Sequence, residues 1–237
     1  MRIIDAVSDL LYPRRCVVCD EVIKFGRKYT CEACASKIVY IKEPFCLKCG
    51  KALAKGSTQE YCGDCAKIRH EYICGGAALD YGSVADSMFR FKNKGREEYA
   101  EFYAKAIYEV KKEFIESIHP DALVPVPIHR TRLAQRGYNQ AYLIARELSK
   151  LSEIPVNSKL IERVKKTDPL KNLGHSQRQN NLKKAFKITS DDVKLKTIII
   201  IDDIYTTGST IDEIARTIHE KVNCKIYFLT VTIGRGI

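Results

Sequence analysis

From about residue 72 onward, apolar runs of strand length alternate with segments of helical period. The clearest run is Ile198 to Ile201, four consecutive β-branched residues typical of a strand buried on both faces of a parallel sheet. Strands separated by helices favour a parallel sheet with right-handed crossovers, and therefore an α/β fold with helices on both faces. The pattern predicts strands at 74–81, 121–127, 159–164, 197–201 and 225–233, and helices within 84–117 (interrupted near Gly95), at 140–151 and after residue 210.

The first 70 residues have different patterns. Residues 2–12 carry an amphipathic helical stripe that ends at Pro13, and we predict that it docks against the rest of the protein. Residues 14–70 form an internal repeat, whose halves open with C-V-V-C-D-E-V-I-K-F-G and C-L-K-C-G-K-A-L-A-K-G. The expected organisation is an N-terminal amphipathic helix at 1–13, a repeated small module at 14–70 and an α/β domain at 72–237.

Cysteines define the chemistry of this repeated module. Eight of the ten cysteines fall in four C-x-x-C pairs, and two such pairs supply the four thiolates of a tetrahedral zinc site. Separate redox pairs or a disulfide scaffold fit this spacing less well. The order of the repeat favours one zinc per half, although the spacing leaves an interleaved pairing open. The predicted structural zinc ligands are Cys16, Cys19, Cys31 and Cys34 in the first half, and Cys46, Cys49, Cys62 and Cys65 in the second.

Composition and charge narrow the class of protein. The chain is 45% hydrophobic and 29% charged, as in ordinary globular proteins, and has no apolar run near the roughly 20 residues of a membrane span. Its N-terminus lacks the pattern of a secretory signal, so we expect a cytoplasmic protein. The formal charge of +11 favours polyanionic partners or phosphorylated substrates.

Two acids and a hydroxyl-rich segment follow the isoleucine strand. The acids stand at the strand's C-terminal end, where open α/β sheets bind ligands, and they suit sugar hydroxyls or a hydrated Mg²⁺. The next segment, T-T-G-S-T, precedes a helical pattern and offers backbone N–H groups, hydroxyls and a favourable dipole to a phosphate. A simpler alternative is a strand, a turn and a well-capped helix. The predicted residues of a phosphorylated-ribose site are Asp202, Asp203, Thr206, Thr207, Gly208, Ser209 and Thr210.

Basic residues follow the expected strand at 121–127. In a parallel sheet, that strand's C-terminal end lies on the same rim as the acid pair. Arginine side chains match phosphate oxygens bidentately, so a loop at 128–140 suits a pyrophosphate group. A long polar segment at 163–186 has the character of a lid. The predicted pyrophosphate and loop residues are His129, Arg130, Arg132, Arg136, Lys165 and Arg178.

Two resemblances connect these features. The stretch T-I-I-I-I-D-D-I-Y-T-T-G-S-T resembles the signature with which type I phosphoribosyltransferases bind 5-phosphoribosyl 1-pyrophosphate (PRPP). Together with the C-x-x-C repeat and P-V-P-I-H-R-T-R-L-A-Q-R-G-Y-N-Q-A, it makes almost the whole chain similar to the ComF family of bacterial competence proteins. Within 163–186, Arg178 and Asn181 match the family pattern, whereas Leu170 replaces a glutamine.

The resemblance implies a double zinc ribbon followed by a type I phosphoribosyltransferase-like domain. It implies that Asp202 and Asp203 hold the ribose 2- and 3-hydroxyls, that 206–210 holds the 5-phosphate, and that Mg²⁺ accompanies PRPP. The expected function is the handling of incoming single-stranded DNA near the inner face of the membrane, with a DNA-uptake helicase or channel as a partner. Phe45, Phe89 and Phe91 are candidates for base stacking.

Two other functions fit the same residues. An active phosphoribosyltransferase would use Asp202 and Asp203 as catalytic residues and transfer phosphoribose to a nucleobase. A regulatory protein would bind PRPP without turning it over. The sequence leaves open whether the chain is an enzyme, as well as the acceptor base and the oligomeric state.

Overall fold

The protein was analysed as a computed structural model, which describes residues 13–23, 29–165, 182, 184–190 and 194–234. The predicted helix at 1–13, apart from Pro13, and the predicted site residue Arg178 lie outside this part of the chain. No helix among the described residues is both long enough and apolar enough to cross a membrane.

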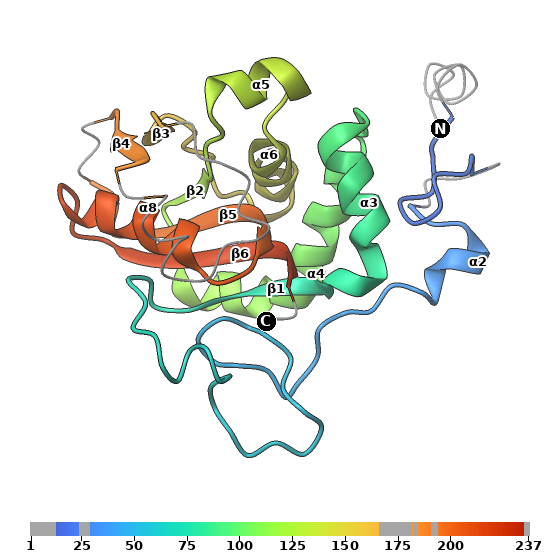
Figure 1. The fold of residues 1–237 in the computed structure, drawn as a ribbon, viewed down its shortest axis with the longest axis horizontal. Helices are drawn as coiled ribbons and strands as arrows, with labels where there is room; N and C mark the ends of the chain where they lie inside the picture. The colour runs from blue at the N-terminus through green and yellow to red at the C-terminus, as the bar shows by residue number, and fades with distance from the viewer. Residues whose placement is uncertain (1–12, 24–28, 166–181, 183, 191–193, 235–237) are drawn as a thin grey trace.

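A four-stranded parallel sheet forms the centre of the molecule (Figure 1). Its strand order is β1-β6-β5-β2, so the isoleucine strand β5 lies inside the sheet between β6 and β2. The predicted α/β class with a parallel sheet is confirmed. The strands are β1 (Gly75–Asp80), β2 (Ala122–Pro125), β5 (Thr197–Tyr205) and β6 (Lys225–Ile233), and the helices are α2 (Glu32–Ala35), α3 (Tyr81–Asn93), α4 (Tyr99–Ile118), α5 (Arg130–Arg136), α6 (Gln140–Ser152) and α8 (Ser209–His219).

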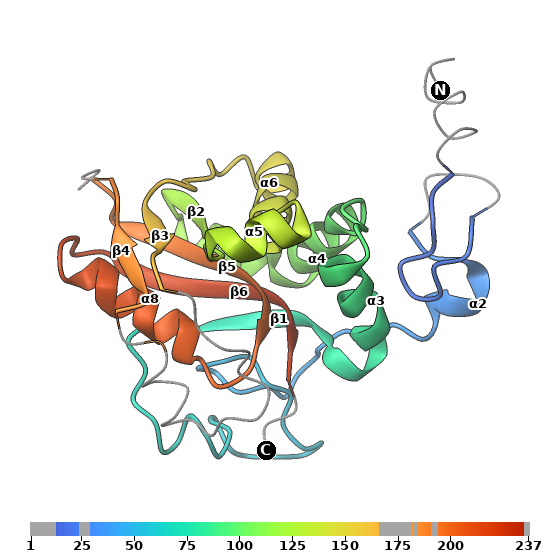
Figure 2. The same cartoon turned by 45° about the horizontal axis from the view of Figure 1, so that its top comes forward.

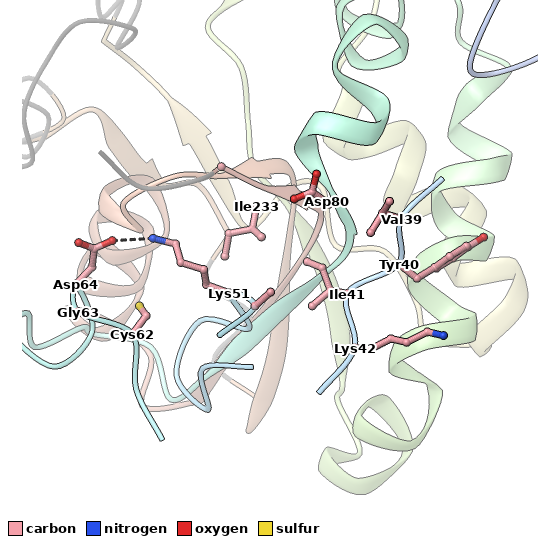
Figure 3. Close-up of a pocket in the computed structure, with 12 residues that line it drawn as sticks. Val39, Tyr40, Ile41, Lys42, Lys51, Cys62, Gly63, Asp64, Asp80 and Ile233 are labelled. Carbon is pink, nitrogen blue, oxygen red and sulfur yellow. Dashed lines mark hydrogen bonds and ion pairs between the residues drawn. The ribbon is translucent and has the colours of Figure 1, made fainter. Parts of the chain in front are cut away.

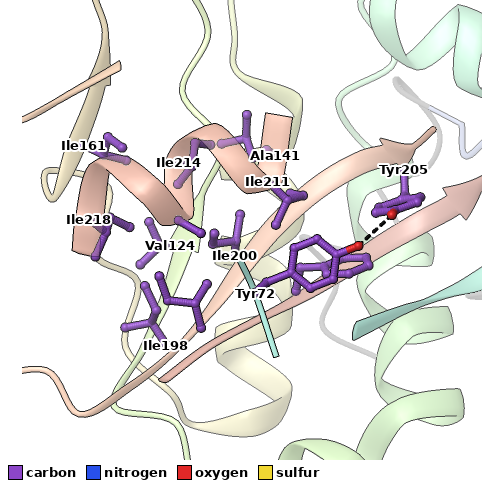
Figure 4. Close-up of a cluster of buried hydrophobic side chains, with 14 of the residues drawn as sticks. Tyr72, Val124, Ala141, Ile161, Ile198, Ile200, Tyr205, Ile211, Ile214 and Ile218 are labelled. Atoms are coloured by element: carbon purple, nitrogen blue, oxygen red, sulfur yellow. Dashed lines mark hydrogen bonds between the residues drawn. The ribbon is translucent and has the colours of Figure 1, made fainter. Parts of the chain in front are cut away.

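The alternating side chains of β5 divide the core into two parts. Ile199 and Ile201 pack with residues of α4 and α6 on one face. Ile198 and Ile200 pack on the other face with Ile214 and its neighbours on α8 (Figure 4). All four isoleucines are fully buried, which explains why this strand is apolar at every position rather than at alternate ones. Helices therefore cover both faces, as predicted.

Two predicted elements have a different form in the structure. The strand expected at 159–164 is β3 (Ile161–Arg163), which pairs antiparallel with β4 (Phe186–Ile188) in a separate two-stranded sheet. Only alternate residues of β4 are buried, so the β3–β4 pair is covered on one face. A central strand of a parallel sheet is covered on both faces, and this pair is therefore not part of the central sheet. The expected basic loop after β2 contains the short helix α5.

The two halves of the cysteine repeat pack on different parts of the α/β domain (Figures 1 and 2). In the first half, Asp20 accepts hydrogen bonds from Arg96 (2.8 Å) and from Tyr99 (2.6 Å) beside and within α4. In the second half, Gly50 approaches β1 so closely that a Cβ there would lie 2.5 Å from the Cα of Gly76. Its backbone φ of +74° also favours glycine.

The second half shares its core with the sheet. Cys46, Cys49 and Cys62 belong to the same buried cluster as Ile200 and Phe228. The sequence alone suggests that zinc removal unfolds 14–70 and leaves the C-terminal domain folded. Because the core is shared, unfolding of the second half would expose apolar residues of the sheet. We therefore expect zinc removal to destabilise the C-terminal domain as well.

Candidate functional site

The acid pair lies near the carboxyl end of β5, shortly before its last residue Tyr205, with both side chains partly buried. The backbone N–H of Asp203 donates to Asp202 Oδ1 at 2.9 Å. Lys92 Nζ, at the end of α3, lies 2.9 Å from Asp203 Oδ2, and the two side chains are only 23% and 13% exposed. The lysine therefore neutralises the charge of Asp203, whereas the charge of Asp202 has no cation at such short range among the described residues.

The electrostatics of Asp202 reflect this arrangement. Burial and the neighbouring charge of Asp203 raise the pKa of Asp202 to about 7, against the smaller opposing effects of the Asp203 N–H, Lys92 and Arg163. Burial and the charge of Arg132 lower the pKa of Arg163, whereas Asp202 raises it. Arginines from β3 and α5 thus act on the same rim as the acid pair. A cation or hydrogen-bond donor bound there would relieve the repulsion between the carboxylates.

The hydroxyl-rich segment forms the turn between β5 and α8. Thr206 is exposed, whereas Ser209 is 4% exposed and its Oγ lies 2.9 Å from Thr207 Oγ1. Gly208 has a φ of +79° and precedes α8, whose first turn receives no side-chain cap among the described residues. Backbone N–H groups at this helix start are therefore oriented as in helix-terminal phosphate sites.

The predicted basic residues divide into separate groups. Arg132 is close enough to the rim to perturb Arg163, but Arg136 donates to Gln140 at 3.1 Å. His129 caps α5, since its Nδ1 accepts from the backbone N–H of Thr131 at 3.3 Å. Arg130 and Lys165 are exposed.

The eight paired cysteines form two compact clusters in sequential order. Within each cluster the sulfur atoms lie within 4.8 Å of one another, and the interleaved pairing is therefore excluded. Cys19 and Cys31 Sγ atoms are 3.8 Å apart, as are those of Cys49 and Cys62. Tetrahedral zinc with Zn–S bonds of about 2.3 Å requires S···S distances of roughly 3.8 Å, so both clusters fit Zn²⁺.

A pocket of about 570 Å³ is lined by residues of the second half of the repeat and by the carboxyl ends of β1 and β6 (Figure 3). Ile41 and Ile233 form part of its apolar wall, and Lys51 pairs with Asp64 at 2.8 Å on its polar side. The pocket reaches Gly234, where a Cβ would lie 3.6 Å from the Thr206 methyl group. It therefore adjoins the hydroxyl-rich turn.

Known proteins resemble the chain over most of its length. A family model described as a double zinc ribbon domain matches residues 7–66. Competence protein ComFC of Bacillus subtilis is 30% identical over 207 residues, covering 81% of this chain and 78% of that protein. The chain belongs to the ComF family.

Other ComF family relatives give the same picture. Competence protein F of Haemophilus influenzae is 28% identical over 87% of this chain and 91% of its own length. DNA utilization protein YhgH of Escherichia coli K12 is 27% identical with the same coverage.

Among solved structures, a purine phosphoribosyltransferase from Pyrococcus horikoshii aligns with a TM-score of 0.36 and 16% identity, over 56% of this chain and 73% of that one.

The structure also identifies residues around the site that the sequence analysis did not assign to it. Lys92 is one of them, and no local signal in the sequence indicates its pairing with Asp203. His70 and Asp212 meet at 2.8 Å beneath the hydroxyl-rich turn. They are 142 residues apart in the sequence, so no motif spacing connects them.

Proposed function

We propose that this ComF family chain functions in competence or DNA utilization by handling incoming single-stranded DNA, and that its α/β domain binds PRPP with Mg²⁺. The names of its relatives, competence protein F, competence protein ComFC and DNA utilization protein YhgH, support the first part. The observation that carries the second is the acid pair at the end of β5, a few residues before the uncapped start of α8.

The ligand would use both features at once. The ribose 2- and 3-hydroxyls would donate to Asp202 and Asp203, since carboxylates accept hydrogen bonds. The 5-phosphate would accept from backbone N–H groups and hydroxyls of 206–210, at the positive end of the α8 dipole. Mg²⁺ would coordinate diphosphate oxygens and water, offsetting the ligand's negative charge. Arg132 would attract the diphosphate, because its charge acts on the same rim of the sheet as the acid pair.

Single-stranded DNA would contact a different set of residues. Of the three predicted stacking residues, Phe91 is fully buried, and Phe45 is partly buried beneath the Lys111 ammonium, 4.6 Å from its ring. Phe89 is 55% exposed and precedes Lys92 by one helical turn. Phe89 is therefore the aromatic residue we assign to base stacking, and exposed Lys94 adds phosphate attraction at the end of the same helix.

Calorimetry tests the ligand proposal. Wild-type protein should bind PRPP in the presence of Mg²⁺, and the double variant Asp202→Ala/Asp203→Ala should bind at least tenfold more weakly because both diol acceptors are lost. Asp86→Ala, at an exposed carboxylate of α3, is the matched control and should bind as wild type. Absence of binding by the wild type would refute the PRPP site.

A transferase is the second candidate function, and the raised pKa of Asp202 favours it. A carboxyl group that titrates near neutrality can exchange a proton during a reaction at physiological pH. Incubation with PRPP, Mg²⁺ and a panel of nucleobases, with an assay for released diphosphate, distinguishes a transferase from a protein that only binds PRPP. Release that depends on one base and disappears in Asp202→Asn would establish transfer; PRPP binding without release would favour a regulatory ligand.

A further inference from the structure

The second cysteine cluster contacts the helix that follows the hydroxyl-rich turn. Cys65 Sγ lies 3.7 Å from His70 Nε2, and the opposite ring nitrogen, Nδ1, lies 2.8 Å from Asp212 Oδ2. The His70 and Asp212 side chains are 1% and 3% exposed. A predicted, partly buried zinc ligand, a buried imidazole ring and a buried carboxylate of α8 therefore form one continuous path.

The carboxylate of Asp212 is directed at the repeat rather than at its own helix. Its second oxygen, Oδ1, accepts from the backbone N–H of Glu71 at 2.9 Å. Asp212 belongs to the first turn of α8, two residues after the segment assigned to the phosphate. An ordinary acidic residue in a first turn remains at the surface, where it interacts with the helix dipole. This one is 2% exposed and connects two parts of the chain.

A second contact joins the same two regions. The hydroxyls of Tyr72 and Tyr205 lie 2.7 Å apart (Figure 4), and Tyr205 is the last residue of β5, directly before Thr206. The Tyr72 ring stacks on His70 with centroids 4.7 Å apart. Both ends of the hydroxyl-rich turn are thus held by His70 and Tyr72, five and seven residues after the last ligand of the second cysteine cluster.

The backbone of the turn packs tightly against the side chains of Tyr205 and His70. A Cβ on Gly208 would lie 2.6 Å from the Tyr205 hydroxyl and 3.1 Å from His70 Cε1. The backbone that turns toward α8 therefore rests on the same two side chains. A displacement of His70 would move the surface against which this backbone packs.

We propose that His70, Tyr72 and Asp212 are positioning residues that couple zinc occupancy of the second four-cysteine site to the 206–210 turn, so that the turn binds a phosphorylated ribose tightly only when that site is loaded. The inference rests on the proposed PRPP site and adds a regulatory metal dependence to it. Because coupling free energies act in both directions, PRPP must also retain zinc in the second site.

Calorimetry with the full-length, zinc-loaded protein tests the first direction. His70→Ala removes the path from Cys65 to Asp212 and should weaken Mg²⁺–PRPP binding about tenfold, within the usual range of coupling between sites. Tyr72→Phe removes one hydroxyl contact, keeps the ring, and should weaken binding about threefold. Arg216→Ala is the matched control, because Arg216 also joins α8 to Glu71 but through an exposed ion pair of 3.4 Å; it should bind as wild type.

Zinc release to a chromogenic chelator tests the reverse direction. In wild-type protein, PRPP should slow release of one of the two zinc ions several-fold and leave the other unchanged, since among the described residues no such path joins the first cluster to the turn. His70→Ala should abolish this protection. A role of His70 in folding alone would change both ions or neither.

The outcomes separate this inference from the proposed function. If wild-type protein does not bind PRPP, both are refuted. If it binds PRPP, but the His70 and Tyr72 variants bind equally well and PRPP protects neither zinc ion, only the coupling is refuted. Should His70→Ala lose zinc during purification, Tyr72→Phe decides, because its substitution leaves the four cysteines and His70 in place.

Discussion

Lys92 Nζ and Asp203 Oδ2 lie 2.9 Å apart, joining the end of α3 to the carboxyl end of β5. This ion pair places a cation beside the predicted ribose site and a single helical turn from the exposed ring of Phe89. The two proposed binding surfaces, one for PRPP and one for single-stranded DNA, therefore adjoin at α3. Lys92 is the residue through which one ligand would affect the other.

We expect Lys92→Met to weaken PRPP binding and to raise its dependence on Mg²⁺. The variant leaves two carboxylates without their nearest cation, so a polyanionic ligand meets more repulsion and requires more metal to offset it. Calorimetry across a Mg²⁺ series should show a loss of about fivefold at low Mg²⁺ that shrinks as Mg²⁺ rises. Lys94→Met, at an exposed lysine on the same helix end, is the matched control. An equal loss at every Mg²⁺ concentration would contradict this account.

Asp202→Asn should stabilise the protein, and more so at high pH. The unfolded carboxyl group loses its proton near pH 3.8, whereas burial and Asp203 keep the native group protonated to about pH 7. The native state therefore binds the extra proton between these values, and stability falls as pH rises through them. The variant avoids this penalty, which is on the order of 4 kcal/mol above pH 7.

Thermal unfolding at several pH values measures this effect. The gain in Tm of Asp202→Asn over wild type should be largest near pH 8 and smaller at pH 5.5. Asp86→Asn should leave Tm unchanged at both values, because that side chain is exposed. A gain that grows toward low pH would show that the native pKa of Asp202 is not raised.

The two cysteine clusters should contribute differently to the stability of the sheet. Cys49 is 1% exposed within the core cluster that contains Ile198 and Ile200, whereas Cys19 is exposed. Cys49→Ser should therefore lower the Tm of the whole α/β domain by roughly 10 °C, equivalent to about 3 kcal/mol. Cys19→Ser should release one zinc with a smaller change. Hydrogen exchange of β5 and β6 measures the difference, and equal protection in both variants would argue against the shared core.

Removal of the exposed ring of Phe89 should weaken binding of single-stranded DNA. Stacking on one base contributes about 1–3 kcal/mol, so Phe89→Ala should lose about tenfold in affinity, while Phe89→Tyr should retain it. Fluorescence titration across a salt series measures both affinity and the number of phosphates contacted. Tyr142→Ala, at a 38% exposed aromatic residue on α6, is the control. Unchanged binding by Phe89→Ala would show that single-stranded DNA does not stack on this ring.

Local features of the sequence determined the zinc clusters and the main strands. A C-x-x-C pair places two thiols on one tight turn, and the run of four isoleucines suits only a position that is buried on both sides. Small hydroxyl residues around a glycine likewise predicted the turn from β5 to α8, where the structure gives Gly208 a positive φ. The strand expected at 159–164 is present as β3, but its antiparallel partner β4 was not predicted, because the partner of a strand is not encoded in the strand itself.

Tertiary structure alone decided what surrounds the predicted site. It paired Asp203 with Lys92, raised the pKa of Asp202 through burial, and brought His70 to Asp212 from 142 residues away. It also chose the sequential arrangement of the zinc clusters over the interleaved one. The physical reason is that spacing and periodicity report on neighbours along the chain, whereas burial and charge compensation depend on which surfaces pack together when the sheet forms.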